Sequence, residues 1–279
     1  MQKIAVIPNM LKDVRLDGTR ALVETIRQCG KTPLMEPEYQ NAGVNAVFVP
    51  KERFREAEML ILLGGDGTIL AGAREYGHLN VPLLGINHGN LGFLTEIEKS
   101  DDAGLLRILG GTYTVADHMT LDVLHGGLSH GALNDAVIHR GAFSRMIEFK
   151  LFVGASLVAT YLADGLIIST PTGSTAYSLS AGGPLADPSL EILIVTPICP
   201  HDLYARSIIL PAAKKIVITV DDADNREAAL TLDGQAVYKL TGDDKIAVTG
   251  GKKIGLIRTP DSSFYQKLRQ KMYEKRFRG

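Results

Sequence analysis

The chain has 279 residues, with 30 Lys and Arg against 31 Asp and Glu, and its formal net charge is -1. This length is about twice that of a usual domain, so it predicts one large or two modest domains, each able to bury its own core. The balanced charge argues against a protein that mainly coats nucleic acid or anionic membrane, and it favours a small-molecule partner.

The two cysteines, Cys29 and Cys199, lie far apart in the sequence and form no C-x-x-C pair. They indicate neither a disulfide framework nor a cysteine zinc site, which fits a reducing compartment. The first apolar run is too short for a secretory signal, and no run reaches the about 20 apolar residues of a membrane-spanning helix. We therefore expect a cytoplasmic protein that does not contact membranes.

Short apolar runs alternate with helical stretches over the first third of the chain. We expect strands at 4–7, 32–35, 59–63 and 81–86, and helices at 18–30 and 68–76. The run Leu60–Leu63 is apolar at every position, as in parallel strands that are covered on both faces. This order predicts βαβ units, with a ligand at the carboxyl ends of the strands.

After about Tyr113 the pattern changes to period-two strands between Gly and Asp turns. Residues 147–153 are the clearest example, and further strands are expected at 166–169, 192–196, 215–220, 229–232, 245–248 and 254–257. This half therefore reads as an all-β sandwich or barrel. Residues 262–279 return to helical spacing and are rich in Lys and Arg. They predict a helix with a solvated basic face, or alternatively an anion-binding tail.

The stretch Gly64-Gly-Asp-Gly-Thr68 lies where a buried strand gives way to a helix. Glycines let backbone N–H groups approach an anion, and the helix amino terminus adds positive potential. The loop lacks the lysine and the spacing of a Walker A motif. A carboxylate beside phosphates favours Asp66 as a base or as a group that acts through a cation; the alternative is that Asp66 only caps the helix.

Residues 164–184 again run from a strand into a turn of small, hydroxyl-bearing residues. We expect these hydroxyls, with the backbone donors of Gly173 and Ala176, to line a polar pocket for riboses and phosphates. Helix capping at Ser174 or Thr175 is the alternative. Considered alone, Asn134 and Asp135 are typical of a turn, and Asp233-Gly234 is typical of a hairpin.

Five stretches, taken together and in order, resemble the NAD kinase family. They are Gly64–Thr68, Asn87–Phe93, Leu133-Asn-Asp-Ala-Val137, Asp164–Tyr177 and Asp233-Gly-Gln235. The first is shared with lipid kinases and 6-phosphofructokinases, whereas Thr170-Pro-Thr-Gly-Ser-Thr-Ala-Tyr177 is more particular to this family. The resemblance implies an α/β plus all-β fold. A Rossmann-like α/β domain at 1–113 would carry the terminal helix at 262–279 packed back on it, and a β-sandwich-like domain at 114–261 would bind NAD.

The resemblance also implies an activity, namely phosphorylation of the 2′-hydroxyl of the adenosine ribose of NAD to give NADP. It implies ATP or polyphosphate as donor, a divalent cation (Mg or Mn) and a homodimer or homotetramer. No motif marks metal ligands, so any metal is expected to arrive with the nucleotide. A lipid or sugar kinase that shares only the loop, and an NAD-sensing module without turnover, are the alternatives.

Individual site residues follow from the same resemblance. Asp66 looks like the family's proton acceptor, with Gly67 beside it as a backbone contact. Leu162 occupies a position where relatives often carry Arg or Gly, so it is not counted among the expected site residues. The other positions that match the family's dinucleotide contacts are Asn134, Asp135, Arg145, Asp164, Thr175, Ala176, Tyr177, Ser180 and Gln235.

Overall fold

The computed structural model describes residues 2–87, 89, 92–141, 145–221, 228–241 and 244–272. The chain divides into two compact units, one formed by Met1–Asp117 with Ile254–Gly279 and the other by His118–Lys253. Both boundaries fall inside long strands, β7 (Thr114–His125) and β18 (Lys245–Arg258). Within the described ranges, no helix is long and apolar enough to cross a membrane.

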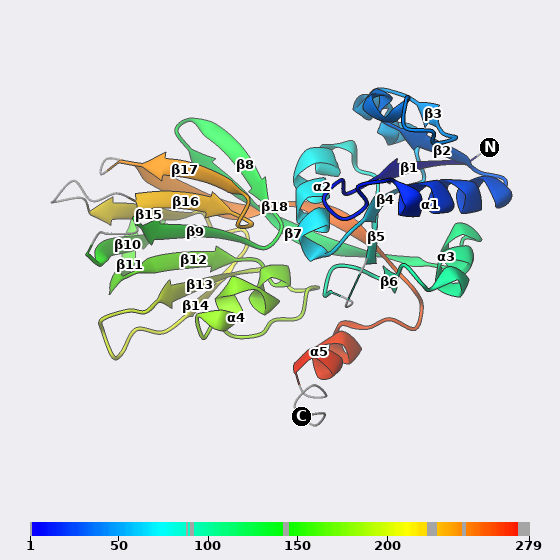
Figure 1. Ribbon diagram of the computed structural model, residues 1–279. Coiled ribbons are helices and arrows are strands. Elements are labelled where there is room, and N and C mark those ends of the chain that lie inside the picture. Colours follow the sequence, from blue (N-terminus) through cyan, green and yellow to red (C-terminus); the bar gives the residue numbers. More distant parts are fainter. Residues whose placement is uncertain are drawn as a thin grey trace. The chain divides into compact units, whose positions relative to one another are not determined.

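The first unit is built on a parallel sheet with the strand order β3-β2-β1-β4-β5 (Figure 1). This is the order of one Rossmann half. Its strands are β1 (Lys3–Ile7), β2 (Thr32–Met35), β3 (Val47–Phe48), β4 (Met59–Leu63), β5 (Leu83–Asn87) and β6 (Ile97–Glu98). Its α-helices are α1 (Asp17–Gln28), α2 (Asp66–Tyr76), α3 (Asp102–Leu109) and α5 (Phe264–Met272), and its 3₁₀ turns are Pro37–Tyr39, Lys51–Glu56 and Gly77–Leu79.

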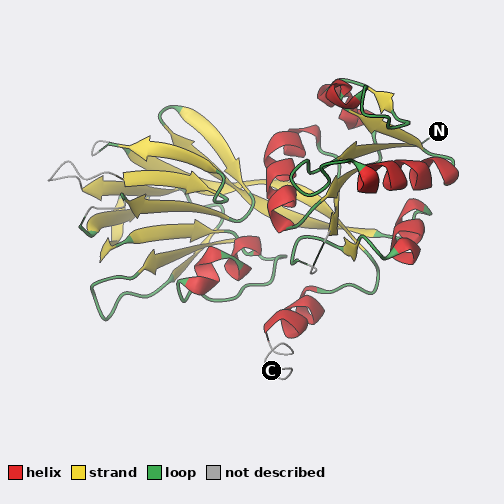
Figure 2. Ribbon diagram, in the orientation of Figure 1, coloured by secondary structure: helices red, strands yellow, loops and turns green. Residues whose placement is uncertain are grey.

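Helices cover both faces of this sheet, which explains why β4 is buried at all of its positions (Figure 2). Helices α1 and α3 share one apolar core with side chains such as Ile61 and Leu84. Helix α2 packs on the opposite face, where Gly72 lies so close to Leu62 that a Cβ there would approach its side chain to 2.1 Å. The apolar runs of the first third therefore form the parallel strands that were predicted.

The second unit consists mainly of antiparallel strands (Figure 2). One sheet has the order β14-β13-β12-β9-β16-β17, and the other joins β11, β10, β15 and the first part of β18 to β7 and β8. The strands are β8 (Leu128–Ala132), β9 (Asp135–Arg140), β10 (Ile147–Val153), β11 (Ser156–Ala163), β12 (Gly165–Ser169), β13 (Ile192–Ile198), β14 (Ile208–Pro211), β15 (Ile216–Asp221), β16 (Ala228–Leu232) and β17 (Ala236–Leu240). A 3₁₀ turn, η4 (Thr172–Thr175), precedes α4 (Tyr177–Ser180).

The alternating residues of β10 point into the core between the two sheets, as their spacing predicted. Phe149 and Leu151 share this core with Ile138 and Ile168 of the other sheet, and all four side chains are fully buried. The predicted combination of an α/β domain, a β-sandwich-like domain and a terminal helix is therefore confirmed. Helix α5 follows β18 and belongs to the first unit.

One prediction about the strands was wrong. The segments 245–248 and 254–257, expected as separate strands, form the single strand β18. Gly250 and Gly251 lie in its interior and do not make a turn. A Cβ at Gly250 would come within 2.8 Å of Ala212, and one at Gly251 within 2.6 Å of Thr120. These two glycines therefore let the segments that contain Ala212 and Thr120 pack closely against β18.

Candidate active site

Asp66 is the first residue of α2 and directly follows the turn Gly64-Gly65 at the carboxyl end of β4. Ligands of α/β sheets bind at this edge, and a helix amino terminus there favours anions. The turn is tight, because a Cβ at Gly64 would lie 2.1 Å from the Thr68 hydroxyl. The Thr68 hydroxyl in turn accepts a hydrogen bond from the Asn9 amide at 2.8 Å, which fastens the segment after β1 to the start of α2.

The Asp66 carboxylate binds the loop after β5 and does not cap its own helix. Its Oδ2 accepts the backbone N–H of Phe93 at 2.8 Å, and its Oδ1 accepts those of Leu94 and Thr95, each at 3.1 Å. A Cβ at Gly92 would lie 1.7 Å from Oδ1, so only glycine fits at that position. The helix-capping alternative for Asp66 is therefore wrong.

A lysine lies over the glycine turn of the same unit. A Cβ at Gly65 would approach the Lys12 ammonium to 3.3 Å. Lys12 follows Asn9 in a short turn, in which the backbone N–H of Lys12 bonds the Asn9 carbonyl at 2.9 Å. Lys12 lies more than 50 residues before the glycine motif, so no local pattern in the sequence connects the two.

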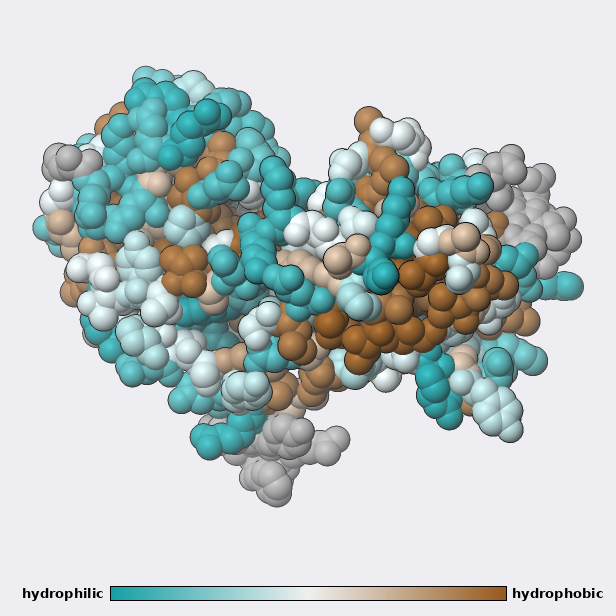
Figure 3. Space-filling view, turned by 180° about the vertical axis from the view of Figure 1, so that it is seen from behind, coloured by the Kyte–Doolittle hydropathy of each residue, from teal (hydrophilic) through white to brown (hydrophobic). Residues whose placement is uncertain are grey.

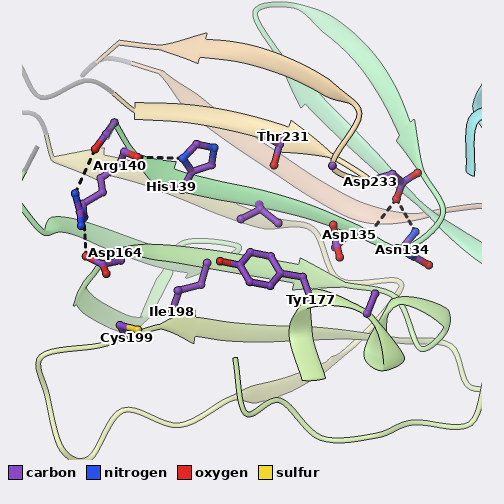
Figure 4. Close-up of a pocket in the computed structure, with 14 residues that line it drawn as sticks. Asn134, Asp135, His139, Arg140, Asp164, Tyr177, Ile198, Cys199, Thr231 and Asp233 are labelled. Atoms are coloured by element: carbon purple, nitrogen blue, oxygen red, sulfur yellow. Dashed lines mark hydrogen bonds and ion pairs between the residues drawn. The ribbon is translucent and has the colours of Figure 1, made fainter. Parts of the chain in front are cut away.

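The second unit contains a pocket of about 820 Å³, which is lined by residues along β9, by Asp164 before β12 and by Ile198 at the end of β13 (Figure 4). Its walls include acidic side chains, Asp135, Asp164 and Asp233, together with Arg140 and the ring of Tyr177. Figure 4 shows the Tyr177 ring extended along the strands between these groups. Tyr177 is 47% exposed, so it forms part of the pocket wall and lies outside the packed core.

Asp233 fixes the start of β9. It sits in the left-handed region at φ 52, in the turn between β16 and β17, as predicted for a hairpin. Its carboxylate accepts the backbone N–H groups of Leu133, Asn134 and Asp135, at 2.9, 2.7 and 3.1 Å. The turn therefore carries the acceptor that orients the Asn134-Asp135 pair.

Asp135 is a buried carboxyl on the pocket wall, and only 4% of it is exposed. Burial, followed by the repulsion of the nearby Asp233, raises the pKa of Asp135 to about 7. A carboxyl with this pKa can be present in both protonation states near neutral pH, so it can donate or accept a hydrogen bond to a ligand.

The turn after β12 is hydrogen-bonded to the backbone just before β9, at Leu133 and Asn134. Thr170 donates its hydroxyl to the Leu133 carbonyl at 2.7 Å, and its backbone N–H to the Asn134 carbonyl at 2.9 Å. A Cβ at Gly173 would lie 2.0 Å from the Asn134 carbonyl oxygen, so glycine is required there. This close approach brings Ala176 and Tyr177 to the pocket beside Asn134.

At the other end of the pocket, Arg140 and Asp164 form an ion pair, with Nε and Oδ1 at 2.6 Å (Figure 4). Neither side chain is fully buried. Cys199 lines the same end of the pocket with an exposed side chain, and its backbone has a positive φ of 45. Cys199 is a free cysteine.

Comparison with known proteins connects both sites to one family. The family model described as the ATP-NAD kinase N-terminal domain matches residues 18–110, and that of the ATP-NAD kinase C-terminal domain matches residues 133–258. The chain is 41% identical over 288 residues to an NAD kinase of Caldanaerobacter subterraneus subsp. tengcongensis, covering 99% of this chain and 100% of the relative. It is 39% identical over 284 residues to the NAD kinase of Acetivibrio thermocellus, covering 99% and 98%.

The chain belongs to the NAD kinase family. Two solved structures share its fold at lower identity. Yeast NADH kinase complexed with NADH has a TM-score of 0.86 at 23% identity, covering 98% of this chain and 88% of that one. An NAD kinase from Archaeoglobus fulgidus in complex with ATP has a TM-score of 0.73 at 22% identity, covering 96% and 97%. As a member of the NAD kinase family, the chain is a phosphotransferase.

The residues expected to form the site of this family divide between the two units. Asp66 and Gly67 belong to the first unit, and the others belong to the second. Of the latter, the pocket walls include Asn134, Asp135, Asp164, Ala176 and Tyr177. Arg145, Ser180 and Gln235 are exposed beyond those walls, and the Thr175 hydroxyl bonds the Thr172 carbonyl at 3.1 Å. Within the motif Asn87–Phe93, residues 88, 90 and 91 lie outside the described residues.

The hydroxyls after β12 serve a different purpose from the one predicted. Ser169, Thr170, Thr172, Ser174 and Ser178 are buried and do not line the pocket. Ser174 donates to the Pro171 carbonyl at 2.6 Å and Thr172 pairs with His118 at 2.8 Å, and neither η4 nor α4 has the side-chain cap that the alternative predicted. Buried hydroxyls need such partners. The bonds of Thr170, Thr172 and Ser174 hold the turn in shape, whereas the buried Ser169 hydroxyl has no partner among the described residues. Ala176 and Tyr177 of the same motif contact the pocket.

Proposed function

We propose that this chain transfers the γ-phosphoryl group of ATP to the 2′-hydroxyl of the adenosine ribose of NAD, forming NADP, with polyphosphate as the other candidate donor. The ribose oxygen forms a bond to phosphorus as the bond to the leaving ADP breaks, and the hydroxyl proton passes to Asp66. The observation that carries the proposal is the match to both NAD kinase domains, which includes Asp66 and the block Thr170–Tyr177.

Asp66 is suited to accept the proton because one of its oxygens keeps acceptor capacity. Among the described residues, Oδ1 accepts N–H bonds from Leu94 and Thr95, whereas Oδ2 accepts only that of Phe93. A carboxylate oxygen has about two lone-pair sites, so Oδ2 can also accept a hydroxyl. A positioned base contributes typically about 10²–10⁴-fold to the rate.

The donor phosphates fit the glycine turn of the first unit. The amino terminus of α2 and the nearby Lys12 ammonium both favour negative charge there. A Walker A loop carries its phosphate-binding lysine inside the motif. In this proposal Lys12, from a different part of the chain, takes the place of that lysine. Phosphoryl transfer depends mainly on such positioning and on neutralisation of the spreading charge.

The described residues do not form a site for a permanently bound metal ion. Among the described side chains, no group of three or more His, Cys, Asp or Glu could hold a metal ion. We therefore treat the divalent cation as part of a metal–nucleotide substrate. Mg²⁺ commonly keeps several waters and is held by substrate phosphates, which agrees with this assignment.

The pocket of the second unit is proposed to bind NAD. Its volume of about 820 Å³ lies within the range of about 300–1,000 Å³ for small-molecule sites. In this proposal the domain predicted at 114–261 supplies the NAD contacts, and that at 1–113 with 262–279 carries the phosphate loop. The contacts are those expected from the sequence: Asn134, Asp135, Arg145, Asp164, Thr175, Ala176, Tyr177, Ser180 and Gln235.

A homodimer or homotetramer in the cytoplasm completes the proposal. On the outward face of one sheet of the second unit, Phe152 pairs in register with Leu157 and Val217, and Val217 pairs with Ala247. All four side chains are at least partly exposed, and apolar groups gather on one face of this unit (Figure 3). Exposed apolar patches commonly mark interfaces, so light scattering of the purified protein should give a mass above that of one chain.

A donor-by-acceptor matrix tests the activity. Purified protein is mixed with Mg²⁺ and either ATP or polyphosphate, and offered NAD, 2′-deoxy-NAD, 3′-deoxy-NAD, a diacylglycerol or fructose 6-phosphate. We expect phosphorylation of NAD and of 3′-deoxy-NAD but not of 2′-deoxy-NAD, since the 2′-hydroxyl is the proposed acceptor. Phosphorylation of the lipid or the sugar in preference to NAD would favour those kinase classes, and binding of NAD without turnover would favour a sensing module.

A further inference from the structure

The loop 92–96 is held from two sides. On one side its backbone N–H groups point to Asp66: those of Phe93, Leu94 and Thr95 all bond the carboxylate. The orientation of the Asp66 carboxylate therefore depends on the position of this loop. Any group that holds the other side of the loop also sets where the carboxylate points.

The carbonyl groups of the same residues are bound by cations from the carboxyl-terminal segment. Arg258, at the end of β18, donates to the Leu94 carbonyl at 3.0 Å and to the Phe93 carbonyl at 3.4 Å. Lys267, in α5, donates its ammonium to the Thr95 carbonyl at 2.7 Å. The peptide groups of residues 93–95 are thus held between one carboxylate and two cations.

Glu96 locks these cations in place. Its Oε2 pairs with Lys267 at 2.8 Å and with Arg258 at 3.0 Å, and its Oε1 accepts the backbone N–H and the hydroxyl of Thr259 at 2.9 and 2.8 Å. Only 1% of the Glu96 side chain and 8% of the Lys267 side chain are exposed. Burial by itself would raise the pKa of Glu96, but Lys267 and Arg258 outweigh it and lower that pKa.

Lys267 is an exception to the solvated basic face that was predicted for the terminal helix: it is buried, whereas Arg269 is exposed as expected and residues 275, 276 and 278 lie outside the described part of the chain. The helix presents further contacts to the same loop: the Phe264 ring lies 6.4 Å from that of Phe93, and the Lys271 ammonium lies 5.0 Å from the centre of the Phe93 ring. A buried lysine is costly unless it is paired, and this one is paired with the loop that holds Asp66.

We propose that Lys267 is a positioning residue for phosphoryl transfer, which holds loop 92–96 so that the Asp66 carboxylate faces the acceptor hydroxyl. This inference rests on the proposed function and on the role of Asp66 in it. Lys267 itself touches no reacting atom. Its loss should therefore lower kcat while leaving the KM for NAD unchanged, because the change affects the orientation of the base and leaves the walls of the pocket intact.

The test compares Lys267→Met with Lys31→Met. Lys31 is the matched control, because it is also a buried lysine of the first unit that forms an ion pair. Its side chain is 7% exposed and bonds Glu58 at 2.9 Å, away from loop 92–96. Both variants should lose thermal stability. We expect kcat to fall by roughly ten- to a hundredfold in Lys267→Met, the scale of a misplacement of about 1 Å, and to stay normal in Lys31→Met. If Lys267→Met does not fold, Lys267→Gln removes the same charge and carries the same expectation.

Two measurements separate positioning from a general loss of structure. Hydrogen exchange of the Phe93, Leu94 and Thr95 amides should accelerate in Lys267→Met and not in Lys31→Met. In an Asp66→Asn background, the Lys267 substitution should cause less than about a twofold further loss of the residual kcat, because both changes act on one step. Equal kcat losses with and without Asp66, or a normal kcat in Lys267→Met, would overturn the inference. Normal turnover of Asp66→Asn alone would instead overturn the role of Asp66 in the proposed function.

Discussion

Replacing Asp135 by asparagine should remove a pH dependence of stability that the buried carboxyl imposes on the second unit. Burial, and then the nearby Asp233, raise the pKa of Asp135 from 3.8 to about 7. Because the folded state holds this proton more tightly than the unfolded state, the protonated carboxyl favours folding. Stability is therefore greatest below about pH 4 with respect to this group, and it is lost as the pH rises to about 7.

The size of the effect follows from the same pKa. One pKa unit corresponds to about 1.4 kcal/mol, so the difference between 3.8 and about 7 corresponds to at most about 4 kcal/mol. This loss falls between about pH 4 and pH 7. Asparagine is almost the same shape and stays neutral, so Asp135→Asn should gain up to about 4 kcal/mol of stability relative to the native protein at pH 8, and a smaller gain of about 1.6 kcal/mol at pH 5.

Urea unfolding followed by circular dichroism at pH 5 and pH 8, without nucleotide, measures the effect directly. The control is Asp117→Asn, since Asp117 is an exposed residue of β7 and should keep the native slope. The reasoning would be refuted if Asp135→Asn and the native protein lost the same free energy of unfolding between pH 5 and pH 8. That result would mean that Asp135 is ionised at little cost in the folded state.

Asp66→Asn should keep the fold and most of the NAD affinity but reduce kcat by about 10²-fold or more, because an amide cannot accept the ribose proton; near-normal turnover would remove Asp66 from the role of base. Tyr177→Ala should raise the KM for NAD with kcat unchanged, and should change stability by no more than about 0.5 kcal/mol, since the ring is 47% exposed. A destabilised variant with the native KM would show that Tyr177 serves packing. Lys12→Met should raise the KM for the phosphoryl donor by about tenfold or more, the value of a charged hydrogen bond to phosphate, and leave the KM for NAD unchanged. An unchanged donor KM would place the donor phosphates away from Gly65.

The sequence by itself determined the features that depend on neighbours along the chain. The fully apolar run of β4 followed by Gly64-Gly65 predicted a buried strand, a tight turn and a helix, and α2 begins at Asp66 as this order requires. The alternation at 147–153 predicted β10, and Asp233-Gly234 predicted the hairpin turn. These patterns are readable because strand period, glycine geometry and helix initiation are set by residues close in sequence.

Family resemblance added what spacing alone did not contain. On their own, Asn134 and Asp135 were indistinguishable from ordinary turn residues. The order of the motifs identified the NAD kinase family, which the matches over both halves of the chain confirm. The assignment of individual contacts in the pocket stays a prediction, to be tested by the variants above.

Tertiary structure alone decided which groups meet across long separations. Nothing local shows that Lys267 would be buried against Glu96, that Asp66 would bind the backbone of residues 93–95, or that Asp233 would orient Asn134. The same holds for β18, where Gly250 and Gly251 resemble a turn in the sequence but lie inside the strand and let neighbouring segments pack closely against it. Burial, and with it the pKa of a group such as Asp135, depends on everything packed around a side chain. That packing is a property of the folded chain as a whole and leaves no mark at a single position in the sequence.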